Sequence, residues 1–167
     1  MTAKKKAARL LFVGVFLCLV ASAVVKEVML LAVIGGVLML LGALKLQEIS
    51  LWVRPVAMLS VAQILWRVLL TVCSYFPELV AGLVLQIGGI VFAVVGLLQL
   101  VFLHNAMLDA KKNGRWAIVC HQLPILEVGY GILVVLGFFS GPVLLIARIV
   151  IGIAMAWYLY RVYQSAE

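Results

Sequence analysis

The sequence predicts an all-α integral membrane protein with about six transmembrane helices. Hydrophobic residues make up 67% of the 167 residues and charged residues only 11%, whereas a soluble domain carries roughly 25% charged residues. A chain this short cannot hide so much apolar surface in a water-soluble fold, because small domains have a large surface for their volume. The apolar residues form continuous runs rather than alternating with polar ones, which favours helices over the strands of a barrel.

Six apolar runs are separated by charged residues, polar residues, glycine or proline. Each run can cross a hydrocarbon core of roughly 30 Å at 1.5 Å per residue, although the first two are short. We therefore expect a single transmembrane domain over residues 1–167, with no room for a soluble catalytic domain. The runs cover Leu10–Val25, Val28–Leu44, Pro55–Phe76, Leu79–Leu103, Trp116–Phe139 and Val143–Tyr163, and the most polar connection is His104–Arg115.

The N-terminal run has two interpretations. Basic residues precede it and Ala21-Ser22-Ala23 lies near its end, as in a cleavable signal peptide. Cleavage there would leave five spans. The next apolar run begins almost at once, so a tight hairpin with a turn at Lys26-Glu27 explains the same residues, and we expect the first span to be retained.

The distribution of basic residues predicts the orientation. With six spans both termini lie on one side, and ten of the 13 Lys and Arg residues fall on that side. Lys26 is the one base on the other side, and Arg67 and Arg148 lie inside spans. Basic loops stay in the cytoplasm, so we expect a multi-pass protein of the plasma (inner) membrane with both termini cytoplasmic. The bases also suit contacts with anionic lipid headgroups.

A weak internal repeat indicates three consecutive helical hairpins. Gly35 and Gly42 are followed by Ala-Leu-Lys-Leu, and 54 residues later Gly89 and Gly96 are followed by Leu-Leu-Gln-Leu. The even-numbered spans also carry small residues four apart, which let helices approach closely. The alternative is that Gly and Ala are simply common in membrane helices. These pairs are Ala32/Gly36, Gly89/Ala93 and Gly152/Ala156.

Three ionisable residues inside the spans form the candidate site. Counting at helical rise from the nearest loop places Arg67 about 19 Å, Glu127 about 18 Å and Arg148 about 20 Å from the cytoplasmic side. A charge at mid-membrane costs roughly 2.5–3.5 kcal/mol, so it normally faces the bundle interior and has a partner. We expect Glu127 to pair with Arg67, Arg148 or both, with Gln86 nearby.

This candidate site has two functional interpretations. One carboxylate between two guanidinium groups leaves a net positive charge, and arginine binds carboxylates and phosphates in bidentate fashion. The residues therefore suit a substrate site for a small molecule or an anion. Alternatively, they form an Arg–Glu–Arg latch that only holds the helices together. The sequence leaves this choice open.

Other function classes find little support. No H-E-x-x-H, G-x-S-x-G or Walker A motif is present, so we expect no enzymatic activity and no cofactor. The two histidines, His104 and His121, have no metal-ligand spacing, so we expect no metal site. The three cysteines lie in separate apolar runs and suit buried small hydrophobes. No basic stripe interleaves with exposed aromatics, so we expect no nucleic acid partner.

In size and span number the chain resembles the substrate-binding subunits of energy-coupling-factor transporters. In that family a stripe of small residues on the first helix docks a partner, and the resemblance assigns this part to Gly14, Cys18 and Ser22. It covers architecture only, and the short loops here depart from the family's ligand-gating loop.

Two functional hypotheses follow. The first is a small-molecule or anion transporter, or a transporter subunit, with a polar site inside the membrane. The second is a non-catalytic membrane scaffold that assembles with itself or with another membrane protein. A ligand at the polar residues favours the first, and an exposed face of small residues favours the second.

Overall fold

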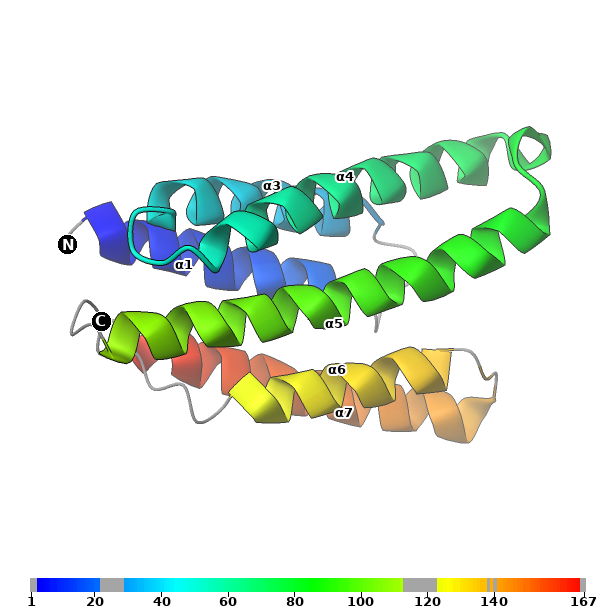
Figure 1. Ribbon diagram of the computed structural model, residues 1–167. Helices are drawn as coiled ribbons and strands as arrows, with labels where there is room; N and C mark the ends of the chain where they lie inside the picture. The colour runs from blue at the N-terminus through cyan, green and yellow to red at the C-terminus, as the bar shows by residue number, and fades with distance from the viewer. Residues whose placement is uncertain (1–2, 22–28, 113–122, 138, 140, 166–167) are drawn as a thin grey trace.

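A computed structural model describes residues 3–21, 29–112, 123–137, 139 and 141–165. Within these ranges every regular element is helical, so the all-α prediction is confirmed. Figure 1 shows an up-and-down arrangement in which the two chain ends lie at the same end of the bundle. The long α-helices are α1 (Ala3–Val15), α3 (Met29–Leu46), α4 (Val53–Tyr75), α5 (Gly82–Lys112), α6 (Leu123–Gly137) and α7 (Pro142–Ser165).

The first helix begins seven residues earlier than predicted, because the basic segment before Leu10 is itself helical. Past Val15 it continues as a π-helix, η1 (Phe16–Ala21). The expected turn at Lys26-Glu27 lies outside the described residues. The second predicted run agrees with α3 to within two residues at each end.

Helices α4 and α5 are joined by a short 3₁₀ turn, η2 (Pro77–Leu79). Helix α4 ends just before this turn because Pro77 disfavours helical backbone at the preceding residue, Phe76. At its other end, Pro55 is tolerated because the first turn of a helix leaves its amides without intrahelical acceptors.

The predicted loop from His104 is wrong over residues 104–112, which belong to α5. This stretch is polar, but its Ala, Leu, Met and Lys residues favour helix and the first glycine comes at Gly114. Polarity therefore did not mark the end of this helix. The rest of the predicted loop lies outside the described residues.

The turn before α7 requires glycine. Gly141 has φ +151°, a conformation that residues with a Cβ rarely adopt. Pro142 then supplies the first helical residue, where its missing N–H costs nothing. The predicted break between the last two runs is therefore confirmed at this glycine.

The helices pack mostly against their neighbours in sequence. Figure 1 shows α1, α3 and α4 on one side, α6 and α7 on the other, and α5 between them. Helix α1 and η1 also contact α7, which closes the bundle. Each predicted hairpin pair is in contact, but α3 packs on α4 as closely as on α1, so the hairpins are not separate units.

Helix α1 and helix α3 approach each other at the level of the backbone. A Cβ on Gly14 would lie 2.5 Å from the Met39 amide nitrogen and 2.6 Å from the Gly35 carbonyl oxygen. A Cβ on Gly42 would lie 2.7 Å from the Leu11 amide nitrogen. Small residues permit such contact between membrane helices.

This packing corrects two sequence-based interpretations. Gly14 faces α3, and the Cys18 thiol donates a hydrogen bond to the Ala32 carbonyl oxygen at 3.2 Å. The described part of the stripe therefore packs inside the chain rather than docking a partner, and Ser22 lies outside the described residues. The two copies of the internal repeat also pack differently. Gly42 of the first copy packs closely against α1, whereas nothing lies within 4 Å of a Cβ built on Gly89 of the second copy.

By length and composition, two helices are able to cross a membrane: Val53–Tyr75, whose apolar 18-residue window has mean hydropathy 1.9, and Gly82–Asp109, whose window has mean hydropathy 2.3. Leu30–Leu46, Glu127–Gly137 and Pro142–Tyr158 are apolar but shorter over the residues searched. These findings give a limited indication of membrane association.

Candidate functional site

The structure distributes the predicted site residues over four helices. Gln86 is exposed on the outer half of α5, the half nearer η2. Arg67 is half-buried on α4, Arg148 is buried on α7, and Glu127 is half-buried on α6. The four residues do not form the compact group that the depth count predicted.

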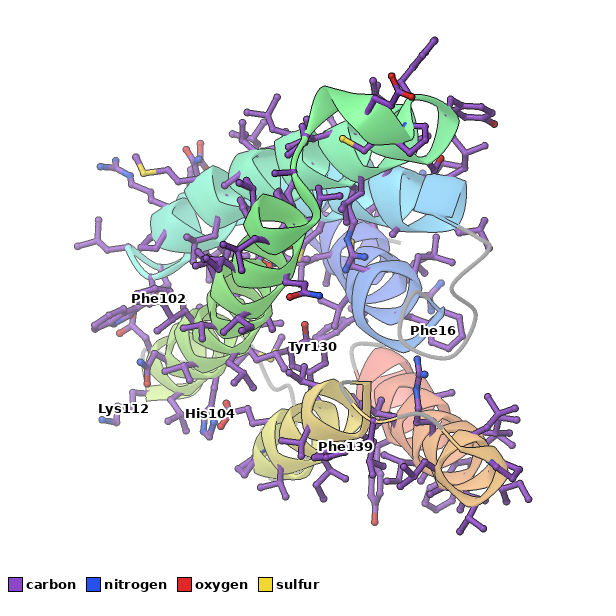
Figure 2. The ribbon with its side chains drawn as sticks, turned by 90° about the vertical axis from the view of Figure 1, so that its right-hand side faces the viewer. Phe16, Phe102, His104, Lys112, Tyr130 and Phe139 are labelled. Atoms are coloured by element: carbon purple, nitrogen blue, oxygen red, sulfur yellow. The ribbon has the colours of Figure 1, made fainter. Side chains whose placement is uncertain are left out.

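The predicted partner of Glu127 is wrong. Its Oε1 lies 3.2 Å from Nδ1 of His104 on α5, and this is the contact that the described structure gives it. Figure 2 shows His104 on the side of α5 that faces α6. His104 itself is part of a helix rather than of the expected loop.

The helix register explains why Glu127 is remote from Arg67. Gln63, one turn before Arg67 on α4, contacts Phe92, which is 12 residues from His104 along α5. At helical rise this separation is about 18 Å. The contact with His104 therefore places Glu127 nearer the end of the bundle that carries Lys112 than the depth count predicted.

The same reasoning separates Glu127 from Arg148. On α6, Gly129 lies under the side chain of Met155 on α7. Glu127 lies two residues from Gly129 toward one end of the bundle, and Arg148 lies seven residues from Met155 toward the other end. The two residues are therefore about 14 Å apart along the helix axes. An Arg–Glu–Arg latch is therefore not the arrangement found in the described residues.

A different set of polar side chains meets in the interior. We call it the central polar cluster; it consists of Ser60, Gln63 and Arg67 on α4, Gln99 on α5 and Tyr130 on α6. The α4 members are spaced three and four residues apart, so they share one helix face. Ser60, Gln63, Gln99 and Tyr130 are buried, and Arg67 is half-buried.

Hydrogen bonds join α4 to α5 through this cluster. Gln99 Nε2 donates to Ser60 Oγ at 3.1 Å, and Ser60 Oγ donates to the Val56 carbonyl oxygen at 2.7 Å. Gln63 Nε2 donates to the Phe92 carbonyl oxygen at 2.9 Å. The amide side chains are thus fixed at their nitrogen ends.

Aromatic packing holds the same interface beside the cluster. The Trp66 ring stacks on Phe92 with centroids 4.7 Å apart and planes inclined by 4°. It also covers Gly88, where a Cβ would overlap the ring. Such pairs contribute about 0.5–1.5 kcal/mol beyond their buried area, so this pair stabilises the interface between α4 and α5.

Helix α6 places Tyr130 against the interface between α4 and α5. Figure 2 shows Tyr130 projecting from α6 into the bundle. Its hydroxyl lies over Gly96 of α5, 2.6 Å from a Cβ built there, and Gly96 is one turn from Gln99. Arg67 is close enough to act electrostatically on both Tyr130 and Cys18.

One buried polar atom in the cluster has unused hydrogen-bonding capacity. Within the described residues, Gln99 Oε1 has no hydrogen-bond partner, and it lies one helical turn from Gly96, which the Tyr130 hydroxyl covers. Gln99 and Tyr130 are only 3% and 6% exposed. An unsatisfied buried group costs about 1–3 kcal/mol, so a polar ligand or water at this place has a donor, an acceptor and a nearby cation to bind.

Most of this cluster was not predicted from the sequence, because its members other than Arg67 carry no charge inside the spans. The signal was present: Ser60, Gln63, Arg67, Thr71 and Ser74 recur every three or four residues along α4. Thr71 and Ser74 use their hydroxyls on their own helix, at the Arg67 and Thr71 carbonyl oxygens. Which partners the stripe meets on α5 and α6 depends on helix packing and was not visible in the sequence.

The described residues contain no group of three or more His, Cys, Asp and Glu side chains able to hold a metal ion. His121 lies outside these residues. A search of family models, a search of curated proteins and a search of solved structures each found no match for the chain.

Proposed function

We propose that this chain is a multi-pass membrane protein with six transmembrane helices: α1 with η1, α3, α4, α5, α6 and α7. The observation that favours a bilayer is the exposure of α5. Its apolar window has mean hydropathy 2.3, yet only 17% of that window is buried within the protein. An apolar helix exposed on most sides needs an apolar solvent.

Charge favours the same arrangement and an orientation. Lys5, Lys6, Lys45, Arg54 and Lys112 belong to the end of the bundle that carries both chain termini. At the opposite end, the described turn η2 carries the acidic residue Glu78. Since basic ends remain in the cytoplasm, both termini are assigned to the cytoplasmic face of the plasma (inner) membrane.

Within this bundle we assign the central polar cluster as the binding site for a small polar molecule or anion, as in a transporter or transporter subunit. The single observation that carries this assignment is the buried Gln99 Oε1, which has no hydrogen-bond partner within the described residues and lies one helical turn from the glycine that the Tyr130 hydroxyl covers. Arg67 adds a positive charge suited to a carboxylate or phosphate group. Arg148, Glu127 and Gln86 stay outside this binding site.

Native mass spectrometry of the protein in mild detergent tests the assignment. We expect a bound small molecule that is lost in Gln99→Met and in Tyr130→Phe, because each change removes a polar group of the proposed site with little change in volume. Gln86→Met is the matched control, since Gln86 is exposed on the same helix. Equal retention in Gln99→Met and Gln86→Met would contradict the site.

One observation favours the second candidate, a membrane scaffold. A Cβ on Gly82 or Gly89 meets nothing within 4 Å, so the outer half of α5 presents small residues to its surroundings. Such faces suit helix association. In the same spectra a scaffold predicts a second copy or another protein in place of a small molecule.

A further inference from the structure

We propose that His104 and Glu127 form a proton-binding site that controls how tightly α6 docks on α5. The site is the 3.2 Å contact between His104 Nδ1 and Glu127 Oε1. It joins two helices that Figure 2 shows side by side, with His104 between them. In the proposed topology it lies toward the cytoplasmic end of the bundle, where protons arrive from water.

The chemistry of one proton changes the charge of this pair. With a neutral imidazole, Nδ1–H donates to the carboxylate and the pair carries one negative charge. A proton added at Nε2 leaves this hydrogen bond in place and makes the pair an imidazolium and a carboxylate with no net charge. The added proton places a positive charge beside the carboxylate, so a Coulomb attraction is added to the hydrogen bond, and a net charge among membrane helices is costly.

Few other side chains described near this site could bind the proton in its place. Histidine is the side chain that ordinarily changes charge between about pH 5 and 8. The side chains of His104 and Glu127 are only 22% and 25% exposed, and within the described structure the side chain of each hydrogen-bonds only that of the other. The other charged or titratable side chains described at this end of the helices packed on α5 and α6 are Arg54, Asp109, Lys112 and Tyr158.

The contact lies next to the central polar cluster along α6. Tyr130 is three residues after Glu127, so the two share a face of α6. Helix α6 therefore contacts α5 at two successive points, His104 with Glu127 and Gly96 with Tyr130. Loss of the proton weakens the contact between His104 and Glu127, and this loosens the contact between Gly96 and Tyr130. Protonation therefore regulates the proposed binding site. This link to Tyr130 and the membrane setting rest on the proposed function, whereas the contact between His104 and Glu127 does not.

A double-mutant cycle on ligand-free protein tests the proton site by itself. Unfolding temperatures in detergent are measured at about pH 5.5 and about pH 8 for wild type, His104→Gln, Glu127→Gln and the double variant. We expect the coupling between the two residues to be larger at the lower pH, where the imidazolium adds its attraction for the carboxylate. Coupling that is absent, or equal at both pH values, would overturn the proposal.

Hydrogen exchange identifies the helix that responds. After correction for the intrinsic effect of pH, we expect α6 amides to lose protection at the higher pH in wild type, while α3 does not change. His121→Gln is the matched control, because it removes the other histidine, and it keeps this response. His104→Gln abolishes it. A response that survives in His104→Gln, or disappears in His121→Gln, would contradict the inference without bearing on ligand binding.

Discussion

Replacing Gly14 or Gly42 by alanine is expected to destabilise the protein strongly. In a helix, alanine normally stabilises by about 0.5–1 kcal/mol relative to glycine. Here the added methyl group meets backbone atoms of the facing helix at 2.5–2.8 Å, and backbone atoms cannot rotate away. Overpacking of this kind costs about 1–3 kcal/mol or more, so the sign of the normal effect is reversed.

The measurement is the apparent unfolding temperature in detergent. Gly89→Ala provides the control, since it is the same substitution within a long apolar helix, with open space around the new methyl group. It is expected to leave the temperature unchanged or raise it slightly. If Gly14→Ala and Gly42→Ala behave like Gly89→Ala, then α1 and α3 are not in backbone contact.

Phe12→Ala is expected to have a comparably large effect, because the first helix is part of the core. Ala7, Leu11, Phe12 and Val15 are each at most 2% exposed. Truncation of a buried phenylalanine costs about 3–5 kcal/mol. Val13→Ala is the control, because Val13 is 39% exposed on the same helix and its truncation leaves no internal cavity.

The same variant distinguishes the two interpretations of the N-terminal run. If the chain is cut after Ala23, Phe12 is absent from the mature protein and Phe12→Ala leaves its stability unchanged. If the span is retained, the unfolding temperature falls and N-terminal sequencing begins at Met1 or Thr2. Sequencing that begins at Val24 would refute the retained span.

The sequence predicted the number and order of the helices that the structure describes, because the apolar runs and their breaks are local signals. The Pro77 and Gly141 turns were predicted for this reason. The end of α5 was not, since helix-forming residues after His104 continue the helix despite their polarity. Local composition fixed which segments are helices better than it fixed their lengths.

The site was predicted less well because it depends on packing. Counting residues along each helix separately placed Arg67, Glu127 and Arg148 at the same depth. However, neither the tilt nor the register of a helix can be obtained by counting from a loop. The contacts at Gly96 and Met155 set the register of α6 in the structure. Gln99 and Tyr130 became visible as a pair only after α5 and α6 were placed together.

The most direct test of the six-span topology uses cysteine labelling in intact cells. In a variant with alanine at the three native cysteines, Lys112→Cys and Glu78→Cys are placed at opposite ends of α4 and α5, where both side chains are exposed. A membrane-impermeant thiol reagent should label Glu78→Cys and should reach Lys112→Cys only after the cells are opened. Labelling of Lys112→Cys in intact cells, or protection of Glu78→Cys there, would contradict the topology.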